Sequence, residues 1–160
     1  MFQGSFVMHE AESGEITQII ERLLREANAK CVYLVDKDGQ LIASSGDTGE
    51  IDVTSLASLT AGNIAATGGM AKLLGEKEFS VLFHEGERDN LHISLVAQRV
   101  ILVVIFDKRS SIGLVRLRVK KASDELARTI KRLTDKMEAV TEKAVLLEEI
   151  TDDDIEKLFS

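Results

Sequence analysis

The sequence predicts one mixed α/β domain whose elements follow the order αββαβββα. An Asp-Gly turn joins two apolar runs between residues 31 and 44, and the segment VILVVIF at 100–106 is apolar throughout. Asp-Gly supplies the positive φ that tight hairpins need, and an all-apolar run is typical of a central strand covered on both faces. Apolar residues at helical spacing precede the hairpin and follow the last strand. With 160 residues, the chain is long enough to bury one core without a metal or a disulfide.

The first half of the chain begins with a helix. We expect Ser13 to cap it, because apolar side chains recur at helical spacing from Ile16 to Ala27. A hairpin with its turn at residues 36–39 follows. The second helix is then expected to begin at Thr54 or Ser55 and to end at Gly75.

The second half continues with three strands and a long helix. Residues 79–84 and 91–97 alternate apolar and polar side chains, as half-buried strands do, and 100–106 is the central strand. The last helix is expected from Ser110 or Ser111 onward, because no proline interrupts the sequence that follows.

Composition and charge limit the classes of function. The net charge of −7 argues against a general nucleic-acid binder. Charge is unevenly placed: residues 108–136 hold ten Lys or Arg against three acids, and 137–160 hold eight acids against two lysines. No apolar run is long enough for a membrane span or a secretory signal, so we expect a cytoplasmic protein. The single cysteine, Cys31, is expected to be an inert core residue, with a reactive role as the alternative.

The second expected helix holds three internal glycines, each of which costs about 1 kcal/mol relative to alanine. A phosphate loop does not explain them, because they lie within the helix and Lys72 is followed by leucine. Helical projection puts large residues on the face toward the sheet, namely Leu56, Leu59, Ile64, Met70, Leu73 and Leu74. It puts small residues on an outward stripe, namely Ala57, Ala61, Ala65 and Gly69, flanked by Ser58, Gly62 and Gly68. We interpret the stripe as a partner or dimer surface; the alternative is an alanine-rich helix buried within its own domain.

The residues of catalytic sites are sparse. The three histidines, His9, His84 and His92, have no zinc-binding helical spacing, although His84 and His92 could face each other across paired strands. Neighbouring acids such as Asp152 and Asp154 lie near the C-terminus, where solvation is the ordinary state. No nucleophile motif appears. We therefore expect no active site, no metal and no cofactor.

Several segments carry a resemblance to a known family. They are VYLVDKDGQLIAS, TSLASLTAGNIAATGGMAKLLGE, FHEG, VILVVIFD and GLVRLRVKKASDEL. Together with the element order they resemble the roadblock/LC7 domain and, within it, bacterial MglB-type proteins. The resemblance runs from about Val7 to Leu126 and resumes in EITDDDIEKLF. It implies a profilin-like fold with a five-stranded antiparallel sheet between helices, a roadblock/LC7 domain at 1–126 and a helical extension with an acidic tail at 127–160.

The resemblance also implies a function. Family members form homodimers through the second helix and the third strand, and MglB-type proteins activate GTP hydrolysis by a Ras-like GTPase of the MglA type in cell polarity or motility. The activator remodels the GTPase and supplies no arginine finger, so the chain itself is not an enzyme. Arg88, Arg99 and Arg109 show no context that would distinguish a catalytic arginine. The implied location is the cytoplasm, concentrated at a cell pole, with no nucleic acid bound and no membrane insertion.

Candidate contact residues follow from the stripe and the resemblance together. The GTPase or dimer helix would use Ala57, Ala61, Ala65, Gly68, Gly69 and Lys72, and the dimer edge strand Phe79, Val81 and Phe83. Beyond the domain, Leu126, Ile130, Leu133, Met137, Val140, Ala144 and Leu147 repeat at spacings of four and three, which indicates an apolar seam along the last helix. At the acidic end, Ile155, Leu158 and Phe159 share one helical face and form a candidate docking segment; the alternative is a frayed or folded-back tail.

Two other functions remain open. A non-catalytic dimeric roadblock scaffold that recruits a GTPase or another signalling partner would share every fold feature. A third interpretation takes the basic run Arg116, Arg118, Lys120 and Lys121 as a patch for anionic membranes or nucleic acid, with a solvated helix face as the alternative.

Overall fold

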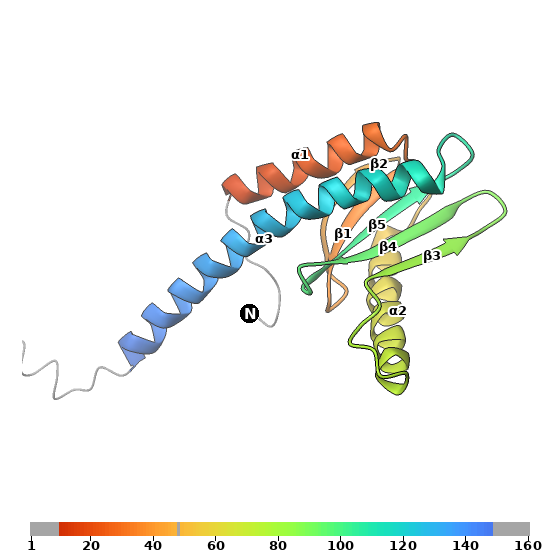
Figure 1. Cartoon of the computed structure of the whole chain (residues 1–160). Helices are drawn as coiled ribbons and strands as arrows, with labels where there is room; N and C mark the ends of the chain where they lie inside the picture. The colour runs from red at the N-terminus through yellow and green to blue at the C-terminus, as the bar shows by residue number, and fades with distance from the viewer. Residues whose placement is uncertain (1–9, 48, 149–160) are drawn as a thin grey trace, which may run out of the picture.

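Five strands form one antiparallel sheet with α1 and α3 on one face and α2 on the other (Figure 1). The structure is a computed structural model that describes residues 10–47 and 49–148. The predicted order αββαβββα is confirmed. The elements are α1 (Glu10–Glu26), β1 (Cys31–Asp36), β2 (Leu41–Gly46), α2 (Val53–Leu73), β3 (Val81–Glu85), β4 (Asn90–Val96), β5 (Val100–Phe106) and α3 (Ile112–Glu148).

The sheet has the strand order β2-β1-β5-β4-β3. β1 and β5 lie at its centre, pair from Cys31↔Ile105 to Asp36↔Val100, and are buried along their whole length. This confirms that the apolar run 100–106 is a central strand, since only a strand covered on both faces can be apolar at every position. β2 and β3 are the edges of the sheet.

The β1–β2 turn follows the Asp-Gly prediction. The buried Asp36 carboxylate accepts hydrogen bonds from the amides of Asp38 and Gln40, both at 2.9 Å. Gly39 adopts φ +92°, the left-handed conformation that glycine accepts without strain. The turn therefore has both the carboxylate that holds it and the glycine that its backbone needs.

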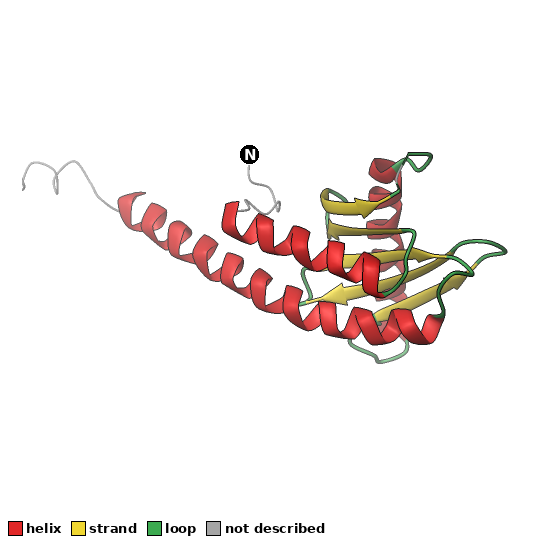
Figure 2. Cartoon of the chain, turned by 90° about the horizontal axis from the view of Figure 1, so that it is seen from above, coloured by secondary structure: helices red, strands yellow, loops and turns green. Residues whose placement is uncertain are grey.

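Helices α1 and α3 run antiparallel and side by side over one face of the sheet (Figure 2). Ile16, Ile20 and Leu23 of α1 pack in one buried cluster with Leu126 and Leu133 of α3. Four ion pairs connect α1 and α3 along their interface: Lys136–Glu12, Arg132–Glu15, Arg22–Glu125 and Arg118–Glu26. Hydrogen bonds from Arg132 lower the pKa of the Glu15 carboxyl.

The start of α1 differs from the prediction. Ser13 lies inside the helix, where its carbonyl accepts a 3.0 Å hydrogen bond from Thr17 Oγ1. The helix already includes Glu10, the first described residue, and its first described turn packs against α3, where the buried Glu12 pairs with Lys136. Ser13 is therefore not the cap of this helix.

The cap of α2 also differs from the prediction, whereas its end agrees. Asp52, and neither Thr54 nor Ser55, is the N-cap: its carboxylate accepts from the Ser55 amide at 3.1 Å and from the Ser55 hydroxyl at 2.6 Å. At the other end, Gly75 has φ +78° and its amide donates to the Lys72 carbonyl, while the Glu76 amide donates to the Ala71 carbonyl. These two bonds form a Schellman motif and confirm Gly75 as the stop.

Helix α3 extends beyond the rest of the domain. The Ser111 hydroxyl accepts a hydrogen bond from the Leu114 amide at 3.2 Å, which confirms the predicted cap. The expected division at 126/127 stays a prediction, and α3 runs through it without a break because Leu126, Ile130 and Leu133 all pack in the core. Past residue 137 the predicted seam is uncovered: Val140 and Ala144 are exposed.

Candidate interaction surface

The outward side of α2 is an exposed apolar surface. Three large side chains lie on it, with exposed fractions of 70% for Leu59, 57% for Met70 and 89% for Leu73. Small exposed residues separate them, and we call the whole set the α2 outer face: Leu59, Gly62, Ala66, Gly69, Met70 and Leu73. The C-terminal end of α2 projects beyond the strands (Figure 1). An exposed apolar surface of this kind is typical of an interaction site.

The predicted orientation of α2 is wrong for four of its six large residues, while Ile64 and Leu56 face the sheet as predicted. The sheet is covered by Ala57, Thr60, Ile64 and Ala71, which are buried, while Leu59, Met70, Leu73 and Leu74 are exposed. A spacing of four residues advances by about 400° around a helix, so a stripe at that spacing drifts by about 40° at each step. The stripe therefore starts buried at Ala57, is half-buried at Ala61 and becomes exposed at Ala65 and Gly69.

Of the expected helix contacts, some remain available to a partner and one does not. Ala57 is buried against the sheet and cannot reach a partner. Ala65, Gly69 and Lys72 are exposed, and Gly68 is half-buried. Their role in binding stays a prediction.

Neither packing nor backbone conformation in the described part of the chain requires glycine at the three glycine positions of α2. A Cβ atom built on Gly62, Gly68 or Gly69 would meet no atom within 4 Å, apart from immediate neighbours and the helix's own backbone. None of the three has positive φ. Alanine would therefore fit each position and favour the helix by about 1 kcal/mol. Within the described part of the chain, neither packing nor backbone conformation explains these glycines.

The edge strand β3 is shorter than predicted and shifted. It spans Val81–Glu85, so Phe79 precedes it. Val81 is 48% exposed, whereas Phe83 is half-buried and stacks on Phe106 with ring centroids 6.1 Å apart. Only the β4 side of β3 is paired within the described chain. The backbone groups on its other side are free to pair with a further strand.

The histidines do not form a site together. His84 pairs with Leu91 and His92 with Phe83, so the two imidazoles lie on opposite faces of the sheet rather than facing each other as predicted. His9 lies outside the described residues. Across residues 10–47 and 49–148, no group of three His, Cys, Asp or Glu could hold a metal ion.

The cysteine is a core residue, as predicted. Cys31 is fully buried and not part of a disulfide. Burial raises the pKa of its thiol to about 11, which keeps it protonated and unreactive at neutral pH. The neighbouring Tyr33 is equally buried, and its hydroxyl lies 3.2 Å from the Thr60 hydroxyl of α2.

The basic run of α3 is divided between two faces. Arg118 and Lys121 point toward α1, where both pair with Glu26. Arg116 and Lys120 instead line a pocket beside β4. The four cations therefore do not form the continuous patch that binding to a membrane or to nucleic acid would favour. No helix in the described part of the chain is both long and apolar enough to span a bilayer.

Comparison with known proteins identifies the family. The model of the Roadblock/LC7 domain matches residues 6–106, which is more than half of the chain. The chain belongs to the Roadblock/LC7 family. No curated protein sequence matches it significantly.

Among solved structures of Roadblock/LC7 proteins, the chain is similar to Myxococcus xanthus MglB, at 61% identity and a TM-score of 0.76, over 79% of this chain and 96% of that one. It is also similar to the gliding protein MglB of Thermus thermophilus, at 34% identity and a TM-score of 0.76, over 81% and 98%. A third structure, described as MglB with tetrameric arrangement, has 33% identity and a TM-score of 0.77, over 82% and 98%. Acanthamoeba castellanii profilin IA, at 13% identity and a TM-score of 0.52, shares the fold alone.

Three exposed residues of this Roadblock/LC7 chain were missed as contact candidates: Leu59, Met70 and Leu73. Large apolar residues occur around most of α2, so periodicity alone cannot tell the covered side from the open one. The glycines could have identified the open side of α2, because Gly62 and Gly69 lie on the same side of the helix as Leu59, Met70 and Leu73. The C-terminal candidates Ile155, Leu158 and Phe159 lie outside the described residues.

Proposed function

We propose that the chain is a dimeric activator of a bacterial Ras-like GTPase of the MglA type, acting in cell polarity or motility and concentrated at a cell pole. Similarity to MglB proteins over more than three quarters of the chain supports this proposal. The observation that carries it is the α2 outer face, because this surface is apolar, exposed and rich in glycines that the chain's own fold does not need. Bare helix backbone allows another protein to approach closely.

Dimerisation would use the free edge of β3 and the α2 outer face, neither of which is covered by the described part of the chain. Antiparallel pairing of β3 with its copy across a two-fold axis would satisfy both exposed edges at once. The α2 outer faces of the two protomers would meet or form a joint platform on which one GTPase molecule binds. Ala65, Gly69 and Lys72 flank or join this platform, and Val81 lies on the edge strand.

The proposed mechanism is remodelling of the GTPase. Phosphoryl transfer is accelerated by positioning and by charge stabilisation, and the arginine that stabilises the transition state can already belong to the GTPase. The α2 outer face contains no arginine. Arg109 is held by Asp107, with hydrogen bonds of 3.1 Å from Nε and from a terminal nitrogen. The chain would therefore bind the arrangement of GTPase loops that is competent for hydrolysis and add no catalytic group.

Single-turnover GTP hydrolysis by the cognate GTPase, with and without this protein, tests the proposal. We expect stimulation of at least about tenfold, within the range that activators achieve. The single variants Arg88→Ala, Arg99→Ala and Arg109→Ala should each keep it. Loss of stimulation with binding preserved in one of them would identify an arginine finger and refute the remodelling mechanism. Tight binding without any stimulation would instead show the non-catalytic scaffold.

A further inference from the structure

A pocket of about 470 Å³ lies between α3 and the strands β3 and β4, on the sheet face opposite α2. The GTPase proposal uses only Val81 of its lining, as part of the edge strand β3. Its polar lining combines two cations, one acid, an imidazole and three hydroxyls: Arg116, Lys120, Asp124, His92, Ser80, Ser94 and Ser123. Val81, Leu95 and Val119 complete the wall.

Two polar side chains of β4 are buried at this pocket without partners. His92 is only 2% exposed and Ser94 only 4%. His92 Nδ1 and Ser94 Oγ have no hydrogen-bond partner within residues 10–47 and 49–148. Since buried polar atoms in folded proteins nearly always have a partner, these two are open to a bond with a group from outside the described chain, such as a ligand. They lie two residues apart on one strand and so point to the same side of the sheet.

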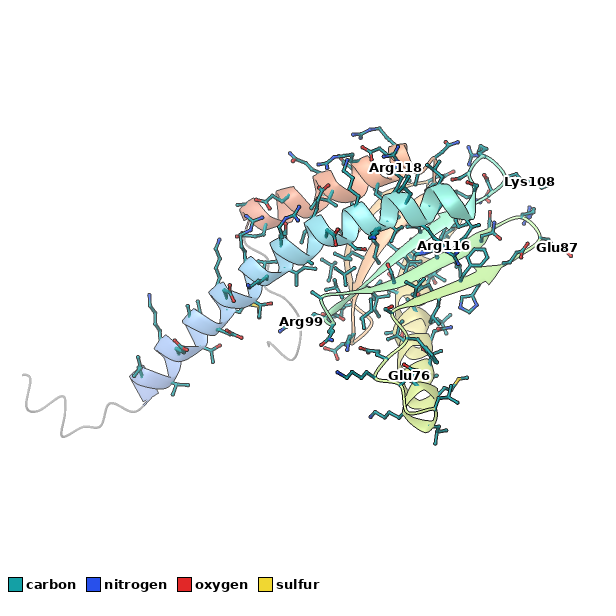
Figure 3. All side chains as sticks on the ribbon, viewed as in Figure 1. Glu76, Glu87, Arg99, Lys108, Arg116 and Arg118 are labelled. Carbon is teal, nitrogen blue, oxygen red and sulfur yellow. The ribbon has the colours of Figure 1, made fainter. Side chains whose placement is uncertain are left out.

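Two cations on α3 lie at the same pocket. Arg116 and Lys120 are one helical turn apart, and neither forms an ion pair or hydrogen bond within the described chain. Arg118 and Lys121, on the other side of α3, both pair with Glu26. Figure 3 shows Arg116 beside β4 and Arg118 on the α1 side. The pocket thus holds two cations that the fold itself does not neutralise, against the single carboxylate of Asp124.

The imidazole of His92 is set to act as a neutral donor. Burial lowers its pKa, and the nearby Arg116 charge lowers it further. The charged groups facing it are Arg116, Lys120 and Asp124 of α3, while β3 and β4 contribute only uncharged lining residues. A neutral imidazole can carry its proton on either nitrogen, so the unpaired Nδ1 can serve as a donor.

We propose that this pocket binds a phosphate group between Arg116 and Lys120 on α3 and His92 and Ser94 on β4. The guanidinium offers five N–H donors and the ammonium three, in addition to the hydroxyls and the imidazole. A carboxylate has two oxygens to accept them, whereas a phosphate has three and carries up to two negative charges. The pocket volume leaves space beside a phosphate, which favours a phosphate monoester of a small metabolite over the free ion.

Histidine NMR tests the proposal on the full-length protein. The chain has only three histidines, so imidazole signals resolve easily, and His84 on the opposite sheet face is an internal reference. Inorganic phosphate should shift the His92 signal saturably, with a dissociation constant of about 1 mM or tighter, and raise its pKa because a bound anion favours the imidazolium. Chloride at matched ionic strength should leave His92 unchanged. Absence of a saturable His92 shift with phosphate and with glycerol phosphate would overturn the proposal.

Two matched double variants of α3 distinguish specific phosphate binding in the pocket from unspecific attraction by the positive charge of the helix. Arg116→Gln with Lys120→Gln should weaken phosphate binding at least about tenfold, because two charge-assisted contacts are lost. Arg118→Gln with Lys121→Gln removes the same charge from the α1 side and should change the affinity by less than about twofold. Equal effects of the two pairs would show unspecific attraction and overturn the site. All four side chains are on the helix surface, so both variants should fold.

The probes also distinguish the ligand classes. Tighter binding of glycerol phosphate than of inorganic phosphate would support a phosphorylated metabolite, and equal binding would support free phosphate. Acetate should bind more weakly than either, because it satisfies fewer donors. Acetate binding as tight as phosphate would overturn the assignment to phosphate. None of these measurements involves a GTPase, so their outcome is independent of the proposed function.

Discussion

Alanine at Gly62 and Gly69 should strengthen the folded chain and weaken its assembly. Both glycines are exposed on the α2 outer face, and an added Cβ would meet no atom within 4 Å apart from its neighbours in the helix. Each substitution should therefore add about 1 kcal/mol of helix stability. Seven residues separate the sites, about 10 Å along the helix, so the gains should add to about 2 kcal/mol. With a urea m-value of about 2 kcal/mol/M, the midpoint should rise by about 1 M.

The same methyl groups should prevent close approach of a partner. Sedimentation velocity over a range of concentrations would measure self-association, and single-turnover hydrolysis would measure stimulation of the GTPase. We expect the double variant to lose at least about tenfold in one of these two, since a methyl group in a packed interface forces the backbones apart. Urea unfolding at several protein concentrations separates chain stability from dimer stability.

Gly14→Ala is the matched control. Gly14 is an exposed helix glycine with the same open surroundings, but it lies in α1. Its substitution should raise stability by about 1 kcal/mol and leave association and stimulation unchanged. If the Gly62→Ala, Gly69→Ala variant gains stability and still associates and stimulates like the wild type, close approach does not explain these glycines and our reasoning about α2 is refuted.

Four further outcomes are expected. Replacing Ala65 and Gly69 with arginine should leave the chain folded because both are exposed, and loss of the dimer would place them in the dimer interface, whereas loss of stimulation alone would place them at the GTPase. Val81→Pro should reduce dimerisation by light scattering if β3 pairs with its copy, and a wild-type monomer at all concentrations would exclude that pairing. Asp52→Ala should lower the urea midpoint; because hydrogen bonds from Ser55 lower the carboxyl pKa, the difference from wild type should disappear as the pH falls through and below the usual carboxyl range. Deleting residues 150–160 should preserve the dimer and its thermal stability but weaken GTPase binding or alter nucleotide release, and unchanged affinity and release would assign the tail no role.

Local sequence patterns correctly predicted those features that depend on interactions between residues close together in the chain. The Asp36–Gly39 turn depends on one carboxylate and one glycine within the turn itself, and both act as expected. The Gly75 stop likewise depends on bonds within six residues. The central strand 100–106 was visible because burial on both faces leaves an apolar signature in its own sequence.

Predictions from local sequence patterns failed where contacts with a distant element determine the structure. Ser13 has the chemistry of a cap, but it lies inside α1, whose first described turn contacts α3 through Glu12 and Lys136, and no local pattern encodes a residue 124 positions away. The predicted orientation of α2 was wrong for a related reason. Its leucines and its single methionine indicated a covered side only under the assumption that the chain covers its own apolar residues. The sequence did not reveal that His92 Nδ1 and Ser94 Oγ lack a partner among the described residues, because this depends on which side chains α3 places beside β4.

The two faces of the sheet differ in how the helices on them place their large apolar side chains. On one face, α1 and α3 bury a continuous apolar cluster and surround it with ion pairs, so removing a large residue there should unfold the chain. On the other, α2 covers the sheet with mostly small residues and turns its leucines and bare glycines outward. Helix propensity would improve if the outward glycines were alanine, lysine or glutamate, and exposed leucines would be replaced by polar residues if solvent were their only neighbour. Residues that lower the stability of the single chain, clustered on one surface, are explained if that surface binds a partner. We therefore expect the partner to bind the side of α2 that faces solvent in the single chain.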